Sequence, residues 1–254
     1  MTQYLIEHFL VGQLQMRCSV VTDLESGDTI IIDGGEEFER ISNWIDHFSG
    51  SGPDWQNQQK EKEDWAHEQF PARKVVGLVN THAHFDHTGH IPFFMDHYNV
   101  DWYLHEDDEY LQSIAQRSAL RWGFQIPEPA KPTQRLFDGQ QLSIGSINLQ
   151  ILHTPGHTLG GCCLLLDSND EESHLFVGDT IFAGSVGRTD LPDSGGDFEV
   201  LARSIREKLW GLPNSTIIHP GHGPLTTIGT EKETNPYVGE QAGRFGTYGF
   251  GKYA

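Results

Sequence analysis

Hydrophobic and polar positions along the chain follow two periods, one typical of strands and the other of helices. Short apolar runs with β-branched residues, bounded by Gly, Pro, Asn or Asp, predict strands. Apolar residues three or four positions apart predict helices that bury one face. The predicted strands cover residues 16–24, 29–32, 74–79, 102–104, 142–152 (two short strands joined near Gly145), 162–166, 174–177 and 216–218. The predicted helices cover residues 36–48, 91–98, 107–121 and 198–209.

Two parts of the chain follow neither period. Residues 50–70 are polar and rich in Gln, Lys and Glu, with only Trp55, Trp65 and Ala66 to bury. We interpret them as a surface insertion rather than a linker between domains, and a functional lid stays open as an alternative. The Gly- and Thr-rich remainder after residue 218 predicts little core. We therefore expect residues 1–254 to form a single domain with a polar insertion at about 50–70.

Charge narrows the possible partners. Seventeen basic residues against thirty-six acidic ones give a formal net charge of −19, which repels phosphate backbones and anionic lipid surfaces. No stretch approaches the roughly 20 consecutive apolar residues that a membrane-spanning helix needs. We therefore expect a small-molecule substrate, no nucleic acid and no membrane. The sequence carries no signal for the oligomeric state.

The cysteines and the N-terminus point to a cytoplasmic protein. The three cysteines cannot form a set of structural pairs, because Cys162 and its neighbour Cys163 point to opposite faces of a strand. The segment Met1–Val11 lacks a cationic start and a long apolar run, so it does not resemble a signal peptide.

Four side chains that can bind metal follow the apolar strand 74–79 within six residues. They are His82, His84, Asp86 and His87. If the chain turns sharply here, residues 82 and 84 can reach one ion while 86 and 87 reach another. Any one of them alone is more simply interpreted as a solvated or fortuitous residue, but four together after an apolar strand favour a metal site.

Three later segments repeat the placement of a donor in a glycine-containing turn after a strand. They are Pro155-Gly156-His157, Gly178-Asp179-Thr180 and Pro220-Gly221-His222. Glycine and proline punctuate loops, and glycine lets the backbone approach a site closely. We therefore expect His157, Asp179 and His222 to meet the first four donors at one edge of a sheet.

The order of these donors, beginning with His-Xaa-His-Xaa-Asp-His at 82–87, resembles the metallo-β-lactamase superfamily over residues from about 14 to 236. Residues 178–192, 220–224 and 231–236 look most like the glyoxalase II (hydroxyacylglutathione hydrolase) group. The tail after residue 222 lacks the length and the apolar periodicity of the helical domain found in larger glyoxalase II enzymes. The compact, single-domain bacterial branch of that group is therefore the expected match.

The resemblance implies an α+β fold, a four-layer αββα sandwich with the metal site at one edge of the paired sheets. It implies two divalent metal ions, most simply zinc, with iron or manganese also suited to these donors. When the family's ligand set is carried over residue by residue, three residues bind only the first ion and three bind only the second. One carboxylate bridges the two ions. The ligands are His82, His84 and His157 for the first ion, Asp86, His87 and His222 for the second, and Asp179 for the bridge.

The implied activity is thioester hydrolysis by a metal-bridging hydroxide, with Asp86 and Asp179 as the catalytic carboxylates. Two cations that share a water lower its pKa from 15.7 to roughly neutral. A thiolate whose parent thiol has a pKa of about 8.5 leaves without much protonation. A persulfide dioxygenase with one iron and a lactonase are the alternatives, and metal content, sulfite formation and lactone ring opening distinguish them. A non-catalytic binding protein would be expected to have lost a donor, and all seven are present.

Polar residues near the donors have expected supporting roles. Asp33, in an Ile-Asp-Gly-Gly turn, is expected to orient a ligand histidine. Arg188 and Asp190 are expected to brace the loop after Asp179 as an ion pair. Three further histidines next to the motifs are expected to be structural: His105, His153 and His219.

Overall fold

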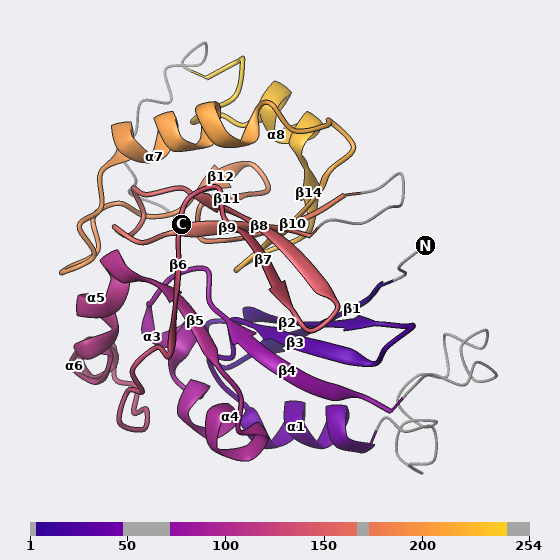
Figure 1. Ribbon diagram of the computed structural model, residues 1–254. Helices are drawn as coiled ribbons and strands as arrows, with labels where there is room; N and C mark the ends of the chain where they lie inside the picture. Colours follow the sequence, from indigo (N-terminus) through magenta and orange to yellow (C-terminus); the bar gives the residue numbers. More distant parts are fainter. Residues whose placement is uncertain (1–3, 48–71, 167–172, 243–254) are drawn as a thin grey trace.

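A computed structural model describes residues 4–47, 72–166 and 173–242, so the predicted insertion at about 50–70 lies outside the described residues. Two six-stranded sheets face each other, and helices lie on both outer faces (Figure 1). This arrangement confirms the expected α+β, four-layer αββα sandwich.

The first sheet contains β1 to β6 in sequence order, and the second has the order β14-β13-β10-β9-β8-β7. The strands of the first sheet are β1 Tyr4–Val11, β2 Met16–Asp23, β3 Asp28–Ile32, β4 Lys74–Val79, β5 Trp102–His105 and β6 Gln134–Leu136. Those of the second are β7 Gln141–Ile144, β8 Ile147–His153, β9 Cys162–Leu166, β10 His174–Gly178, β13 Ile217–Pro220 and β14 Thr226–Thr227. A small separate sheet pairs β11 Ile181–Phe182 with β12 Ser185–Val186. Among the described strands, the chain therefore passes from one large sheet to the other in the turn at residues 137–140.

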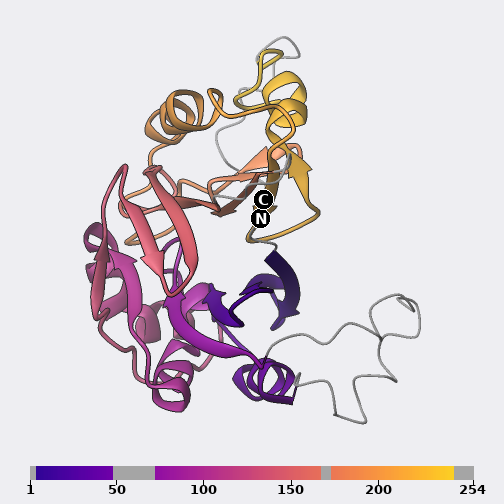
Figure 2. The ribbon, with the colours of Figure 1, turned by 45° about the vertical axis from the view of Figure 1, so that its right-hand side comes forward.

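The helices lie at the outer faces of the two sheets and at one end of them (Figure 1). The helix α1 covers the first sheet together with α4, while α7 and α8 cover the second (Figures 1 and 2). Their bounds are α1 Phe38–His47, α3 Phe85–Thr88, α4 Ile91–Tyr98, η2 Glu106–Asp108, α5 Glu109–Ser113, α6 Ala115–Arg121, α7 Phe198–Ser204, η3 Ile205–Leu209 and α8 Ile228–Thr234.

The core has three layers, and the two faces of β3 contribute to two of them. Ile30 and Ile32 pack between the sheets, against residues such as Ile151. Ile31 points to the opposite face, where it joins the cluster that contains Ile41 of α1. Successive side chains of a strand point to opposite faces, so a slip of one residue would exchange these two environments. Since a buried Ile contributes about 1.5–3 kcal/mol, the pattern fixes the register.

Some predicted elements differ from the structure. The helix predicted at 107–121 is a 3-10 turn followed by two short helices that meet at Ile114. The expectation of little core after residue 218 is wrong, because Ile228 and Val238 are buried against α7. Thr227 caps α8 by accepting a hydrogen bond from the Thr230 backbone N–H, a local signal that composition alone does not show. The strand β1 was not among the predicted ranges.

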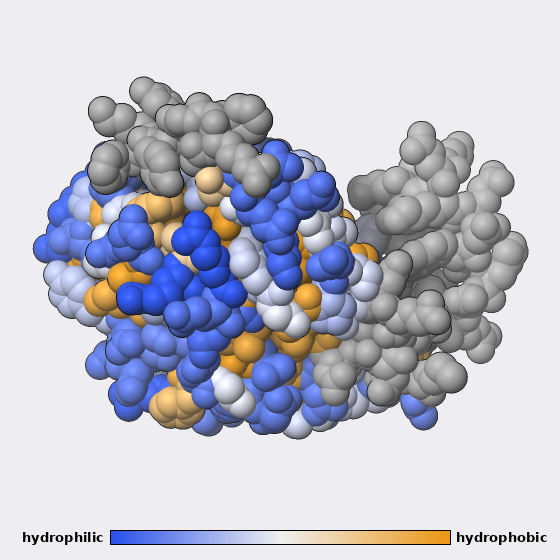
Figure 3. Space-filling view, turned by 90° about the horizontal axis from the view of Figure 1, so that it is seen from above, coloured by the Kyte–Doolittle hydropathy of each residue, from blue (hydrophilic) through white to orange (hydrophobic). Residues whose placement is uncertain are grey.

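The surface seen from above, on the side of α7 and α8, is a mixture in which hydrophilic residues separate the hydrophobic ones (Figure 3). Among the described residues, no helix combines the length and the apolar character needed to cross a membrane.

Candidate metal centre

The seven predicted donors follow the carboxyl ends of four strands, three of which run in parallel in the second sheet. In the second sheet β10 pairs parallel with β13, and β8 runs in the same direction because both β8 and β10 are antiparallel to β9. The turns after these three strands carry His157, Asp179 and His222. In the first sheet, the loop after β4 carries His82 and His84. The remaining donors, Asp86 and His87, lie on the short helix α3.

Three histidines form a first group. The Nε2 atom of His82 lies 3.0 Å from Nδ1 of His84. The ring of His157 lies 4.8 Å from that of His82 and 4.6 Å from that of His84, measured between centroids. One nitrogen of each ring lies within 4.8 Å of the others, so these three side chains can share one ion. All three are buried.

A second group consists of Asp86, His87 and His222. The Nε2 atom of His222 lies 3.3 Å from Oδ2 of Asp86, and Nε2 of His87 lies 3.8 Å from the same oxygen. The carboxylate of Asp179 lies between the groups. Its Oδ1 is 3.4 Å from His87, while its Oδ2 is 3.5 Å from His157 and 3.7 Å from His222, each distance measured to Nε2.

Unsatisfied buried atoms show that the residues fit metal ions. The Nε2 atoms of His87 and His157 and Oδ1 of Asp179 are buried and have no hydrogen-bond partner within the protein. A buried polar atom without a partner costs roughly 1–3 kcal/mol. Nε2 of His87 lies 3.4 Å from Oδ1 of Asp179, and Nε2 of His157 lies 3.5 Å from Oδ2 of the same carboxylate, so cations bound on the two sides of Asp179 would remove the penalty from all three atoms. Mixed imidazole and carboxylate donors suit zinc, iron and manganese.

Burial and charge divide the histidines into two kinds. Burial, with a contribution from neighbouring histidines, lowers the pKa of His82 well below its usual value and that of His84 to about 3. Burial also lowers the pKa of His87, but Asp179, Asp86 and Asp33 outweigh it and hold that pKa well above the usual value. The pKa of His222 is likewise raised, because Asp179 and Asp86 outweigh burial. Without metal, the second group therefore holds protons where the first does not.

Asp179 shows the reciprocal effect. Burial raises the pKa of its carboxyl group, but His222 and His87 outweigh burial and hold the pKa well below the usual value. The carboxylate that lies between the two groups is therefore ionised and can attract cations.

Each histidine also has a partner on the nitrogen that faces away from the centre. Nδ1 of His87 lies 3.0 Å from Oδ2 of Asp33, which confirms that Asp33 orients a histidine of this cluster. The same carboxylate accepts the Thr81 backbone N–H and the Thr81 hydroxyl, each at 2.8 Å. The Thr81 hydroxyl in turn lies 3.1 Å from Nδ1 of His82. The other partners are the Leu14 carbonyl for His222, the Arg188 carbonyl for His157 and the Ser194 hydroxyl for His84.

Asp108 contacts the loops next to the donors, and no pattern in the sequence points to it. Its Oδ2 accepts hydrogen bonds from the Ala83 N–H and the Thr158 hydroxyl, both at 2.9 Å, and its Oδ1 accepts the Gly160 N–H at 2.6 Å. Ala83 and Thr158 adjoin donors in two different sheets. A single buried carboxylate therefore joins the two loops that carry the first group.

Comparison with known proteins agrees with this geometry. The family model of the metallo-β-lactamase superfamily matches residues 11–222, which include all seven donors. The chain belongs to the metallo-β-lactamase superfamily. It is 33% identical to hydroxyacylglutathione hydrolase GloC of Haemophilus influenzae, over 93% of this chain and 99% of that protein.

Two solved structures are similar to this chain over nearly their whole length. The di-iron-bound form of TTHA1623 has a TM-score of 0.71 and 32% identity, covering 91% of this chain and 100% of that one. The B3 metallo-β-lactamase BLEG-1 has a TM-score of 0.74 and 29% identity, covering 92% and 99%. The superfamily assignment and the donor set together make this chain a metallo-hydrolase superfamily protein.

Other polar residues near the seven donors of this superfamily site contact one another. Arg188 and Asp190 form the expected ion pair at 2.9 Å. His219 lies 2.9 Å from His174 and 3.0 Å from His8, nitrogen to nitrogen, in a chain of imidazoles between the two sheets. These contacts agree with structural roles.

His105 and His153 stack in parallel, with centroids 4.1 Å apart and an angle of 10° between the rings. Asp107 lies close enough to complete a further set of possible donors with them. The nitrogen lone pairs lie in the ring planes, so two parallel stacked rings cannot direct them at one ion without rotating. We therefore assign this pair to packing, as expected from the sequence.

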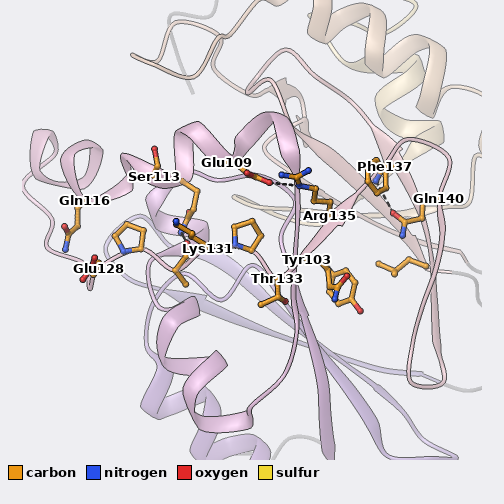
Figure 4. A pocket seen from close by; sticks show the side chains of 16 residues that line it. Tyr103, Glu109, Ser113, Gln116, Glu128, Lys131, Thr133, Arg135, Phe137 and Gln140 are labelled. Carbon is orange, nitrogen blue, oxygen red and sulfur yellow. Dashed lines mark hydrogen bonds and ion pairs between the residues drawn. The ribbon is translucent and has the colours of Figure 1, made fainter.

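A groove of about 1060 Å³ lies apart from the centre, between α5, β6 and the proline-containing segment 128–133 (Figure 4). None of the seven donors lines it. Its one arginine, Arg135, pairs with Glu109 at 2.8 Å and with Glu106 at 3.3 Å, so its charge is already compensated. The groove offers no residue to the metal centre.

Proposed function

We propose that this chain is a hydrolase with two divalent metal ions that cleaves a thioester of the hydroxyacylglutathione type. The observation that carries the proposal is the position of Asp179, whose two carboxylate oxygens are shared between two groups of donors. A carboxylate in that position favours two ions over one. The similarity to hydroxyacylglutathione hydrolase GloC supports the choice of substrate.

Bound divalent ions of this type supply a nucleophilic water at neutral pH and polarise a carbonyl group. The histidines of the first group are in the protonation state that metal binding requires. Burial lowers the pKa of His82, His84 and His157, so these imidazoles are neutral and keep a lone pair at physiological pH. Zinc is the first expectation, and iron and manganese suit the same donors.

The carboxylates Asp86 and Asp179 are the proposed catalytic groups. Burial opposes ionisation of Asp86, but His87 and His222 outweigh burial and lower its pKa. Both carboxylates are therefore anionic and can hold the cations and orient a water. A thiolate leaving group with a parent pKa of about 8.5 needs little protonation, so the proposal requires no separate acid on the protein.

The site is open on the side of the second group. The side chain of His222 is 28% exposed, whereas that of His87 is fully buried. Substrate therefore reaches the centre past His222. Phe182 lies at the same side, with its ring 6.2 Å from that of His222, and adds an apolar surface there.

Elemental analysis of freshly purified protein, combined with turnover of S-lactoylglutathione in the same sample, tests the proposal. We expect close to two ions per chain and release of free thiol. Cys162→Ser should leave both results unchanged, because Cys162 is a buried strand residue outside the donor set. One iron per chain, with sulfite formed from a persulfide and oxygen, would instead indicate a persulfide dioxygenase. Two ions with ring opening of a lactone and no thioester cleavage would indicate a lactonase.

A further inference from the structure

One loop reaches the first group of donors at two points. It runs from Arg188 to Asp197, and its first residue offers a backbone carbonyl that lies 2.6 Å from Nδ1 of His157. Further along, the Ser194 hydroxyl lies 2.7 Å from Nε2 of His84. Two of the three histidines in the group therefore depend on this loop for the partner of their outer nitrogen.

The contact at Ser194 sets the tautomer of His84. A neutral imidazole carries one proton, on one of its two nitrogens. Nδ1 of His84 faces the donor nitrogen of His82 at 3.0 Å, so it is the atom available to an ion. The proton then belongs on Nε2, where it is donated to the Ser194 hydroxyl. Ser194 is 2% exposed and His84 is 8% exposed, so water has little access to replace this hydrogen bond.

Ion pairing and capping hold Ser194 in place from both sides. On one side, Oδ2 of Asp193 lies 2.6 Å from Nη1 of Arg121 and 3.6 Å from Nη2 of Arg117, both on α6. On the other side, Asp197 caps α7 by accepting the Val200 N–H at 3.0 Å. The loop is therefore fixed to helices of both halves of the sandwich.

The helix that holds Asp193 also contacts the helix that carries donors of the second group. Phe85 of α3 packs against Ala115 and Ala119 of α6. The loop, α6 and α3 thus form one connected unit around the centre.

We propose that Ser194 is a positioning residue that fixes the tautomer and orientation of His84 for the first ion, and that the Asp193–Arg121 pair keeps Ser194 in place. This inference rests on the proposed metal centre. Loss of an outer partner of a ligand histidine costs about 10–100-fold in metal affinity. We expect that loss for the first ion in Ser194→Ala. The second ion, whose histidines have Asp33 and Leu14 as partners, should change by less than about threefold by the same reasoning.

Stepwise zinc binding, measured by competition with a chromophoric chelator, tests this. His157→Ala and His222→Ala, each of which removes a donor from one group, assign the two binding steps. Ser194→Thr, which keeps the hydroxyl, should restore most of the affinity. Ser42→Ala is the matched control, because Ser42 is also buried and its hydroxyl donates to a backbone carbonyl in α1, away from the centre.

A second measurement reports on the tautomer without metal. Nitrogen chemical shifts of the histidine rings in the metal-free protein should show one tautomer for His84 in the wild type and a mixture in Ser194→Ala. An unchanged tautomer together with unchanged zinc affinity in Ser194→Ala would overturn the proposal. Equal weakening of both ions would also overturn it, because it would indicate a general loss of structure.

A separate variant tests the role of the Asp193–Arg121 ion pair. Asp193→Asn should weaken the first ion by up to about fivefold, since exposed pairs contribute only about 0–1 kcal/mol. The effect should diminish at high salt. Glu109→Gln, which removes a pair of similar exposure from Arg135, should leave both ions unchanged. An equal effect of the two variants would contradict the role given to Asp193.

These readouts are separate from turnover. If the wild type binds two ions but hydrolyses no thioester, the proposed substrate fails while the role of Ser194 is still decided by zinc affinity. If thioester hydrolysis is found and Ser194→Ala changes neither affinity nor tautomer, only the role of Ser194 fails.

Discussion

Replacing Gly221 by alanine would test how closely the backbone surrounds the centre. A Cβ atom at this position would collide with Oδ1 of Asp179 and would lie 2.7 Å from Cε1 of His87. The backbone of Gly221 cannot easily withdraw, because its N–H donates to the Gly178 carbonyl at 2.8 Å and its carbonyl accepts the Arg17 N–H at 2.7 Å. The two donors must therefore move instead.

The size of the movement follows from the contact distance. Ordinary contact begins at 3.4 Å, so His87 must retreat by about 0.7 Å, and Asp179 by more. Metal–ligand distances tolerate only about ±0.2 Å. We therefore expect Gly221→Ala to lose at least about tenfold in affinity for both ions, since Asp179 is shared, and about 100-fold in turnover. Overpacking should also lower the free energy of unfolding of the metal-free protein by about 1–3 kcal/mol.

Chelator competition, elemental analysis and thermal unfolding of the metal-free protein would measure these effects. Gly211→Ala is the matched control, because nothing lies within 4 Å of its added Cβ atom and it should behave as the wild type. If Gly221→Ala retained two ions with wild-type affinity, the close approach of backbone to donors described above would be refuted.

Three further changes test the centre from other directions. Asp179→Ala removes the shared carboxylate and should reduce the affinity for both ions, while Cys162→Ser keeps two ions by elemental analysis. Asp33→Asn replaces an acceptor of the His87 N–H and should weaken zinc binding by about 10–100-fold in chelator competition, whereas Asp23→Asn, at a buried aspartate outside the centre, should not. Zinc binding should release protons and strengthen as pH rises from about 6 to about 8, because the raised pKa of His87 means that metal must displace a proton. Calorimetry in buffers of different ionisation enthalpy would contradict this if it found no proton release.

The clustering of the seven side chains was predictable because each of them follows a strong local pattern. An apolar strand followed by a turn with glycine or several histidines is visible in a linear sequence, and strands that run in parallel bring such turns to one edge. Asp33 likewise lies in a glycine-containing turn directly after an apolar strand. The predicted placement of the seven side chains therefore needed little knowledge of tertiary packing.

Ser194 and Asp108 had no such pattern. Ser194 lies in a loop without periodicity, and its partner is 110 residues away. Asp108 falls within a segment predicted as one helix, where an acidic residue looks like an ordinary solvated side chain. Only the folded chain shows that its carboxylate accepts hydrogen bonds from loops of both sheets. Contacts that connect distant loops are set by tertiary structure, so the sequence of the loop does not reveal them.

The turn at residues 137–140 has a practical consequence, because it separates the two large sheets along the chain. A cut there would give two fragments, one carrying the four donors up to His87 and the other carrying His157, Asp179 and His222. Neither fragment alone holds a complete set of ligands. Zinc would therefore favour the reassembled pair, by about 2.7 kcal/mol when its concentration is a hundredfold above the dissociation constant. Severed at this turn, the protein would become a two-piece sensor that reconstitutes in response to free metal.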